Sequence, residues 1–203
     1  MKTSQKVIVV VGSTASGKSD FAVQFAKKCN GEIISADSRQ VYKGLDIGTG
    51  KIKEDEMGGV PHHMLDVYAL GEEVSVARFA RDATPILEDI LSRGKTPIIC
   101  GGTGQYIDAL IYDTSLPKVE PNYTLRNELE KKSTDELFTL LQSHDPHRAE
   151  TIDRYNPSRL VRALEIVESL GTVPPQQKPK FKLPTDIYIM APSRELLRTR
   201  ITR

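Results

Sequence analysis

The chain has 203 residues, a formal net charge of +1, 38% hydrophobic residues and 27% charged residues, a composition typical of a globular protein with a buried core. No apolar run approaches the roughly 20 residues that span a bilayer, and the N-terminal MKTSQK lacks the apolar segment and cleavage site of a signal peptide. Cys29 and Cys100 show neither metal-ligand spacing nor a disulfide framework. We therefore expect two core thiols in a reduced, cytoplasmic protein without membrane association.

The small net charge conceals an uneven distribution. Residues 154–203 contain ten Lys or Arg and four Asp or Glu, so the rest of the chain is net negative. A basic segment of this kind either attracts phosphate groups or is ordinary solvated surface, and composition alone leaves both interpretations open.

The N-terminal part alternates strand and helix patterns. Val7–Val11 is a β-branched run typical of a buried parallel strand. Lys18–Cys29 carries apolar residues at helical spacing and is followed by the helix-ending pair Asn30-Gly31. Glu32–Asp37 indicates a second strand, with Asp37 at its C-terminal end.

A long glycine-rich loop is predicted next, over Ser38–Gly59. A helix is predicted over Ser75–Arg93, and Pro85 inside it predicts a kink or a break. Thr96–Cys100 indicates another strand. Alternation of strands and helices predicts the α/β class with a parallel sheet.

The pattern changes near residue 117. Ser133–Glu136 matches a capping box ahead of a leucine-rich run, Pro157–Leu170 predicts a helix, and Gly171–Pro184 is a proline-rich linker before the strand Ile187–Met190. We therefore predict an all-helical insertion domain, 117–184, within an α/β core formed by 1–116 and 185–203.

A phosphate site is predicted between the first strand and the first helix. The segment Gly12-Ser13-Thr14-Ala15-Ser16-Gly17-Lys18-Ser19 fits G-x-x-x-x-G-K-[ST]. In such a loop, backbone N–H groups and the helix dipole attract an anion. Lys18 then supplies a point charge to the outer phosphates, and the Ser19 hydroxyl is a Mg²⁺ ligand.

Other candidate residues follow the strands. Asp37 is suited to binding Mg²⁺, to accepting a proton, or to capping a helix, because ligands bind at the carboxyl ends of strands in such sheets. Thr103, within Gly101–Gly104, either hydrogen-bonds a substrate or belongs to a tight turn. The adjacent His62 and His63 face opposite ways on a strand, so we expect packing and hydrogen bonds rather than a shared metal.

A basic helix face is the last candidate. Arg159 and Arg162 lie three residues apart on the predicted helix and so share a face, with Arg154 just before it. This face either binds a nucleic-acid backbone or is solvated.

Five motifs together resemble the tRNA dimethylallyltransferase family. They are GSTASGKS (12–19), DSRQVYKGLDIGT (37–49), PHHMLD (61–66), GGTGQY (101–106) and RLVRALE (159–165). This family transfers an isopentenyl group to the adenine 3′ of the anticodon. The resemblance covers nearly the whole chain and implies a P-loop NTPase-like sheet.

The resemblance also implies roles for residues. The loop would hold the diphosphate of dimethylallyl diphosphate with Mg²⁺ as the cofactor, Thr14 would lie near the bond that breaks, and Asp37 would be the general base. The insertion domain would grip the anticodon stem-loop of tRNA, and the enzyme would act as a monomer. The implied tRNA contacts are Asp37, Ser38, Arg39, Gln40, Thr103, Arg126, Ser158, Arg159, Leu160, Val161 and Arg162.

Two departures from the family accompany this resemblance. The segment GTVPPQQKPKFKLP (171–184) fits the family only loosely. Members of the family continue well beyond the position of Arg203, so we expect a truncated chain that lacks a catalytic arginine of the family.

Three alternatives remain. Adenylate isopentenyltransferases, which modify free AMP or ADP, share the loop and the aspartate, but a free nucleotide needs no helical insertion. A small-molecule kinase fits the loop alone and leaves DSRQVYKG unexplained. A non-catalytic tRNA-binding module would result if truncation removed activity.

Overall fold

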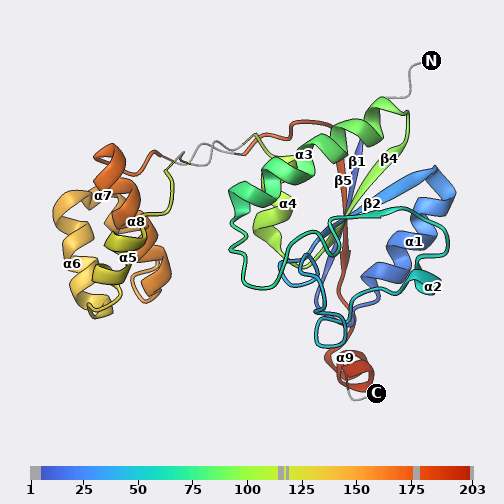
Figure 1. The fold of residues 1–203 in the computed structure, drawn as a ribbon, viewed down its shortest axis with the longest axis horizontal. Coiled ribbons are helices and arrows are strands. Elements are labelled where there is room, and N and C mark those ends of the chain that lie inside the picture. Colours follow the sequence, from blue (N-terminus) through green and yellow to red (C-terminus); the bar gives the residue numbers. More distant parts are fainter. Residues whose placement is uncertain (1–5, 114–116, 118, 176–178, 202–203) are drawn as a thin grey trace. The chain divides into compact units, whose positions relative to one another are not determined.

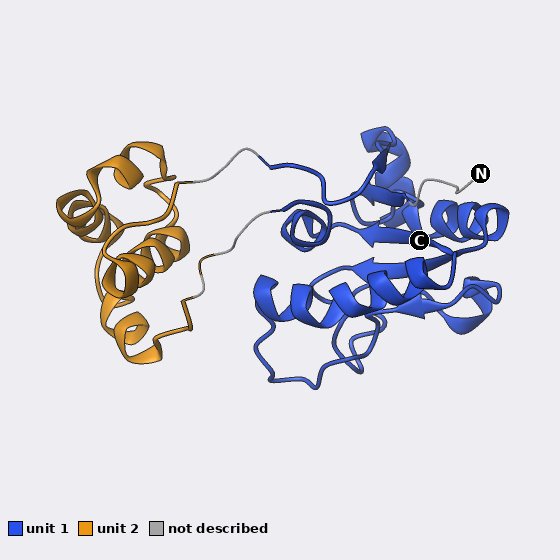
Figure 2. Cartoon of the chain, turned by 90° about the horizontal axis from the view of Figure 1, so that it is seen from above, with its two compact units in different colours: residues 1–114, 179–203 blue, residues 115–178 orange. Residues whose placement is uncertain are grey.

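The computed structural model describes residues 6–113, 117, 119–175 and 179–201. The chain forms two compact units, which we call the sheet unit (1–114 and 179–203) and the helical unit (115–178) (Figure 2). The helical insertion was predicted to end at residue 184, whereas the helical unit ends at residue 178. Residues 180–182 belong to the sheet unit because their backbone pairs with it. The Lys180 carbonyl oxygen accepts from Asp113 N at 2.8 Å, and Lys182 N donates to the Ile111 carbonyl oxygen at 2.9 Å.

One five-stranded parallel sheet forms the centre of the sheet unit. Its strands are β1 (Val7–Gly12), β2 (Gly31–Ala36), β3 (His62–His63), β4 (Thr96–Gly101) and β5 (Thr185–Met190), in the spatial order β3-β2-β4-β1-β5. This arrangement confirms the predicted P-loop NTPase-like α/β class.

Helices cover the two faces of the sheet, because successive side chains of a strand point to opposite faces. On one face, Val9 and Ile99 pack with α3 (Val76–Ser92) and α4 (Gly104–Ile111). On the other, Val10 and Ile98 pack with α1 (Lys18–Cys29). Figure 1 shows α1 on one side of the sheet and α3 and α4 on the other.

The helix α3 continues through Pro85, so the predicted possibility of a break was wrong. Its buried face, which includes Phe79, Ala83 and Leu87, anchors the helix to the sheet on both sides of the proline and compensates for the missing backbone donor. The hydroxyl of Ser75 caps its start by accepting from Arg78 N at 3.2 Å. The short helices α4 and α2 (Glu54–Met57) were not predicted, since neither spans enough residues to show a clear periodicity.

The helical unit contains α5 (Tyr123–Leu129), α6 (Thr134–His144), α7 (Pro146–Thr151) and α8 (Pro157–Leu170). Its core includes Leu137, Leu141, Leu160 and Leu164. The predicted capping box is present, since the Glu136 carboxylate accepts from Ser133 N at 2.8 Å.

The described part of the chain ends with α9 (Arg194–Ile201), which lies beyond the end of β5 (Figure 1). None of the helices in the described ranges has the length and apolarity needed to cross a bilayer.

Candidate active site

The loop between β1 and α1 has the backbone of an anion site. Ala15 and Gly17 adopt left-handed conformations, with φ of 61° and 86°. Gly17 is the N-cap of α1 and offers no side-chain acceptor to the N–H groups of the first turn. These donors, together with the positive end of the helix dipole, favour a phosphate group.

Two side chains of the loop are also available to an anion. The Ser16 hydroxyl is buried and has no hydrogen-bond partner. The Lys18 ammonium lies 3.4 Å from the Ser13 carbonyl oxygen and forms no ion pair with any residue that the structure describes. A buried hydroxyl without a partner is costly unless a ligand pairs with it, and the partly exposed Lys18 ammonium attracts anions, so both fit an anion in the loop.

The ends of β2 and β4 are held together next to this loop. A Cβ atom placed on Gly101 would lie 2.1 Å from the Ala36 carbonyl oxygen, so only glycine permits this approach. Thr103 N donates to the same oxygen at 3.1 Å. The Thr103 hydroxyl accepts from Ser38 N at 3.0 Å.

Asp37 follows β2 directly and organises a turn. Its Oδ1 atom accepts from Arg39 N at 2.9 Å and Gln40 N at 3.3 Å. The Gln40 amide donates to Thr49 O at 3.1 Å and so fixes the glycine-rich loop beside the site. Of these predicted contacts, Arg39 is exposed, whereas Ser38 and Gln40 are half-buried.

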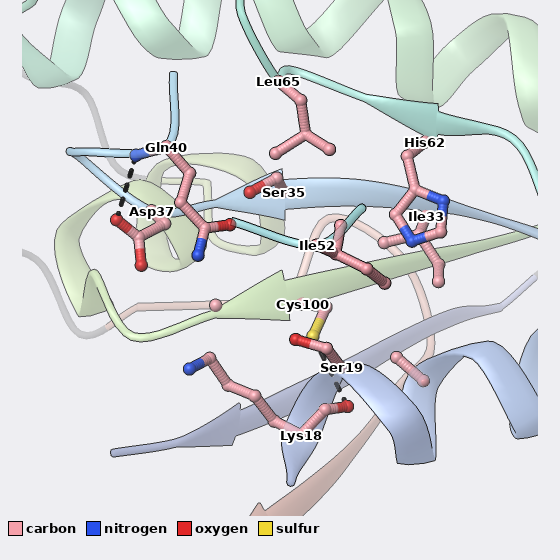
Figure 3. A pocket seen from close by; sticks show the side chains of 12 residues that line it. Lys18, Ser19, Ile33, Ser35, Asp37, Gln40, Ile52, His62, Leu65 and Cys100 are labelled. Atoms are coloured by element: carbon pink, nitrogen blue, oxygen red, sulfur yellow. Dashed lines mark hydrogen bonds between the residues drawn. The ribbon is translucent and has the colours of Figure 1, made fainter. Parts of the chain in front are cut away.

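The phosphate loop and the Asp37 turn face one cavity of about 400 Å³. Its lining residues are Thr14, Ala15, Ser16, Gly17, Lys18, Ser19, Asp20, Asp37, Gln40, Thr49, Gly50, Ile52, Glu56 and Arg200. Figure 3 shows a smaller adjoining pocket that shares Lys18, Ser19, Asp37 and Gln40, with the end of β4 between Lys18 and Asp37. Residues distant in sequence thus surround the space above the loop.

The donor set around Ser19 fits Mg²⁺ that arrives with a phosphate ligand. Ser19 and Asp37 line the same cavity, and the described ranges contain no group of three or more His, Cys, Asp or Glu side chains that would bind a metal alone. Protein sites commonly hold Mg²⁺ through one or two carboxylates, substrate phosphates and water. The residues present therefore fit Mg²⁺, and its binding stays a prediction.

The two histidines behave as expected from the sequence. His62 Nδ1 lies 2.8 Å from Val60 O, and His63 Nε2 lies 2.8 Å from the Glu32 carboxylate. Burial lowers the pKa of His62. Both are structural hydrogen-bonding residues.

The helical unit brings several predicted tRNA contacts together around a groove of about 450 Å³. The groove is lined by Arg126, Glu130, Lys132, Leu137, Pro157, Ser158, Val161 and Arg162. Leu160 is fully buried in the core of the unit. Its side chain is therefore out of reach of an RNA, although it helps to position the helix.

The basic residues of this unit have different environments. Arg126 donates to the buried Glu165 carboxylate at 2.9 and 3.1 Å, and Arg162 also bonds it. Although burial opposes ionisation, these hydrogen bonds hold the pKa of Glu165 below its usual range. Arg159 is 61% exposed and lies 3.9 Å from Asp153. Arg159 is thus the more available cation of the predicted pair.

One cavity residue was missed at the sequence level. Arg200 comes from α9 and reaches the phosphate loop, 185 residues away from its contact. The sequence contained no signal for this approach, because it depends on the path that the chain takes from β5 to α9 past the loop.

Comparison with known proteins identifies relatives of the chain. The profile of the IPP transferase family matches residues 40–203. A tRNA dimethylallyltransferase from Anoxybacillus flavithermus is 49% identical over 167 residues, which are 82% of this chain and 54% of the relative. The chain thus spans about half the length of this curated relative.

Solved structures give the same result. The full-length tRNA isopentenylpyrophosphate transferase from Bacillus halodurans is 38% identical, with a TM-score of 0.63 over 98% of this chain and 64% of that one. A eukaryotic dimethylallyltransferase acting on tRNA is 34% identical, with a TM-score of 0.73 over 92% of this chain and 48% of that one.

Proposed function

The chain belongs to the IPP transferase family, and from that premise we propose that it transfers a dimethylallyl group from dimethylallyl diphosphate to tRNA. The acceptor is the exocyclic amine of the adenine 3′ of the anticodon, and pyrophosphate is released. The relatives that carry the name tRNA dimethylallyltransferase support this assignment.

The observation that carries the proposal is the pairing of an anion site with a carboxylate across one cavity. The phosphate loop offers unsatisfied N–H groups, the Ser16 hydroxyl and the Lys18 ammonium. Asp37 lines the same cavity. Prenyl transfer to an amine requires a site that stabilises an anionic leaving group and a group that accepts a proton.

The reaction forms a C–N bond, breaks a C–O bond and moves one proton from nitrogen to a carboxylate. The adenine amine attacks the allylic carbon, and the bond from that carbon to the diphosphate oxygen breaks with its electron pair staying on pyrophosphate. Lys18 and the loop N–H groups stabilise the negative charge that develops there. Asp37 takes the proton that the amine loses. Because this amine is a poor nucleophile, positioning supplies much of the rate.

We assign Mg²⁺ to Ser19, with Asp37 as a second candidate ligand; when bound, the ion neutralises diphosphate charge. Thr14, on the loop, is proposed to contact the diphosphate next to the bond that breaks. The remaining implied contacts, Ser38, Arg39, Gln40 and Thr103 in the sheet unit and Arg126, Ser158, Arg159, Val161 and Arg162 in the helical unit, are proposed to hold the anticodon stem-loop. The adenine must leave its stack to be modified.

The experiment mixes purified chain with Mg²⁺, radiolabelled dimethylallyl diphosphate, and either an anticodon stem-loop RNA or AMP. We expect label on the stem-loop only. Replacing the target adenine by guanine is the matched control and should abolish labelling.

The other outcomes separate the alternatives. Label on AMP would assign the protein to the adenylate isopentenyltransferase type. In a parallel reaction with ATP in place of dimethylallyl diphosphate, transfer of phosphate to a small molecule would indicate a kinase. Binding of RNA and diphosphate without any label would indicate a non-catalytic tRNA-binding module.

A further inference from the structure

A second cation lies over the phosphate loop. Arg200, in α9, donates from Nη1 to the Ala15 carbonyl oxygen at 3.1 Å. Ala15 is one of the two loop residues with a left-handed backbone. The contact therefore touches the loop where its conformation creates the anion site.

The guanidinium also lies against Gly17. A Cβ atom placed on Gly17 would be 3.0 Å from Arg200 Nη1 and 3.9 Å from Nη2. The absence of a side chain at this position lets the arginine approach the backbone closely. Arg200 and Lys18 line the same cavity of about 400 Å³.

The Arg200 guanidinium has N–H donors and a positive charge that its contact with Ala15 leaves unused. A guanidinium carries five N–H donors, and the structure assigns one hydrogen bond to Arg200, to a neutral carbonyl. No carboxylate in the described ranges pairs with it. A planar cation with free donors beside a phosphate loop suits bidentate recognition of phosphate oxygens.

We propose that Arg200 is a diphosphate-binding residue, which contacts the substrate from α9 while Lys18 contacts it from α1. This inference rests on the proposed function and deepens it. Through the Ala15 carbonyl the same side chain also holds the loop in its binding conformation. The two cations then share the charge of the leaving pyrophosphate, each from a different element of the fold.

The test is calorimetric titration of inorganic pyrophosphate with Mg²⁺ into the purified chain and four variants, Arg200→Ala, Arg200→Lys, Lys18→Ala and Arg194→Ala. We expect Arg200→Ala to weaken binding roughly 10- to 100-fold, as for loss of a hydrogen bond to a charged group. Arg200→Lys should recover part of the affinity, because it keeps the charge but not the fork. Arg194 is the control, since it lies on the same helix but outside the residues that line the cavity.

Thermal unfolding separates ligand contact from simple support of the loop. For a ligand contact, Arg200→Ala should lose part of the rise in melting temperature that Mg²⁺-pyrophosphate produces, whatever loss of the Ala15 contact does to the melting temperature without ligand. A lower melting temperature without ligand and an unchanged affinity would overturn the proposal in favour of a structural strap.

The outcomes also distinguish the two proposals. If Lys18→Ala loses binding and Arg200→Ala does not, the role of Arg200 is wrong and the proposed function stands. If the unmodified chain binds no pyrophosphate, the phosphate site fails and both proposals fall with it.

Discussion

The hydroxyl of Thr103 accepts a hydrogen bond from the backbone N–H of Ser38 at 3.0 Å. Thr103 is the N-cap residue of α4, but its side chain does not cap that helix. It instead connects the end of β4 to the turn that Asp37 begins. The position of the proposed general base therefore depends on Thr103, which lies 65 positions after its hydrogen-bond partner Ser38.

Thr103→Val tests this connection. The variant removes the acceptor for Ser38 N, so we expect a loss of about 0.5–1.5 kcal/mol in the free energy of unfolding. We also expect roughly a 10-fold fall in transfer to the stem-loop, since small displacements of a reacting group are costly. Affinity for Mg²⁺-pyrophosphate should stay unchanged. Thr103→Ser keeps the hydroxyl and should behave as wild type; an equally impaired serine variant would contradict the role of this hydrogen bond.

Asp37→Asn separates proton transfer from structure. An asparagine Oδ1 still accepts from Arg39 N and Gln40 N, as the aspartate does at 2.9 and 3.3 Å. Transfer should fall about 10²- to 10⁴-fold, the range for loss of a general base, with pyrophosphate affinity retained. Single-turnover transfer and calorimetry measure the two quantities. If the affinity falls as well, Asp37 is a Mg²⁺ ligand.

Arg159→Ala tests RNA binding by the helical unit. Because Arg159 is 61% exposed and 3.9 Å from Asp153, its removal should leave stability unchanged. It should weaken stem-loop binding and reduce the slope of log K against log salt by about 1 if it contacts a phosphate. Titrations at several salt concentrations give this slope. An unaltered slope would return Arg159 to ordinary solvated surface.

Arg162→Ala is the contrasting variant. Arg162 and Arg126 neutralise the buried Glu165, so its removal leaves a buried charge with fewer partners and should destabilise the helical unit. A loss of RNA binding in this variant is informative only after the folded fraction has been measured.

Local patterns in the sequence were sufficient for most of the fold. The first helix was predicted over the residues that form it, Lys18–Cys29, and β1 and β4 differ from the prediction by one residue each. These elements combine a strong periodicity with a clear start or stop signal. Pro85 was misleading because the local cost of proline was outweighed by packing of α3 on the sheet.

The site was less accessible to sequence reasoning. The phosphate loop is contiguous, so its pattern is visible in the sequence. The pairing of Arg126 and Arg162 with Glu165, and of Arg200 with Ala15, joins residues 39, 3 and 185 positions apart. The sequence shows where the arginines are, but it does not show that a buried carboxylate neutralises Arg126 and Arg162 while Arg200 contacts only a carbonyl oxygen.

Glu32→Gln tests a buried charge cluster at the opposite ends of the strands. The Glu32 side chain is 3% exposed and accepts from Arg93 at 2.5 and 2.9 Å and from Lys95 at 2.6 Å. The Arg93 guanidinium in particular holds the pKa of Glu32 well below its usual range. Because Arg93 and Lys95 are 37% and 31% exposed and so stay partly hydrated, removing the Glu32 charge should cost about 1–3 kcal/mol at pH 7.

The pH dependence of this effect has a defined sign. A carboxyl whose pKa is depressed by folding contributes stability above its unfolded pKa of about 4.3, and that contribution is lost as the pH falls toward the folded pKa. Wild type should therefore lose stability below about pH 5 more steeply than Glu32→Gln. Urea unfolding at pH 7, 5 and 3.5 measures this, with the exposed Glu54→Gln as control. Parallel pH profiles of wild type and Glu32→Gln would contradict the assignment.

The thiol of Cys100 should be inert in the folded protein. Cys100 is buried beneath the phosphate loop, where its Sγ atom donates to Lys18 O at 3.7 Å, and burial raises its pKa to about 12. At pH 8 on the order of one thiol in 10⁴ would then be ionised, against roughly a quarter for a free cysteine with a pKa of 8.5.

Alkylation by iodoacetamide should therefore require opening of the loop region. Mg²⁺-pyrophosphate should slow alkylation further, because a ligand held by Lys18 stabilises the closed loop. Peptide mapping by mass spectrometry separates Cys100 from the half-buried Cys29. Rapid labelling of Cys100 that pyrophosphate does not slow would show that the loop is open without ligand and that the anion site is not preformed.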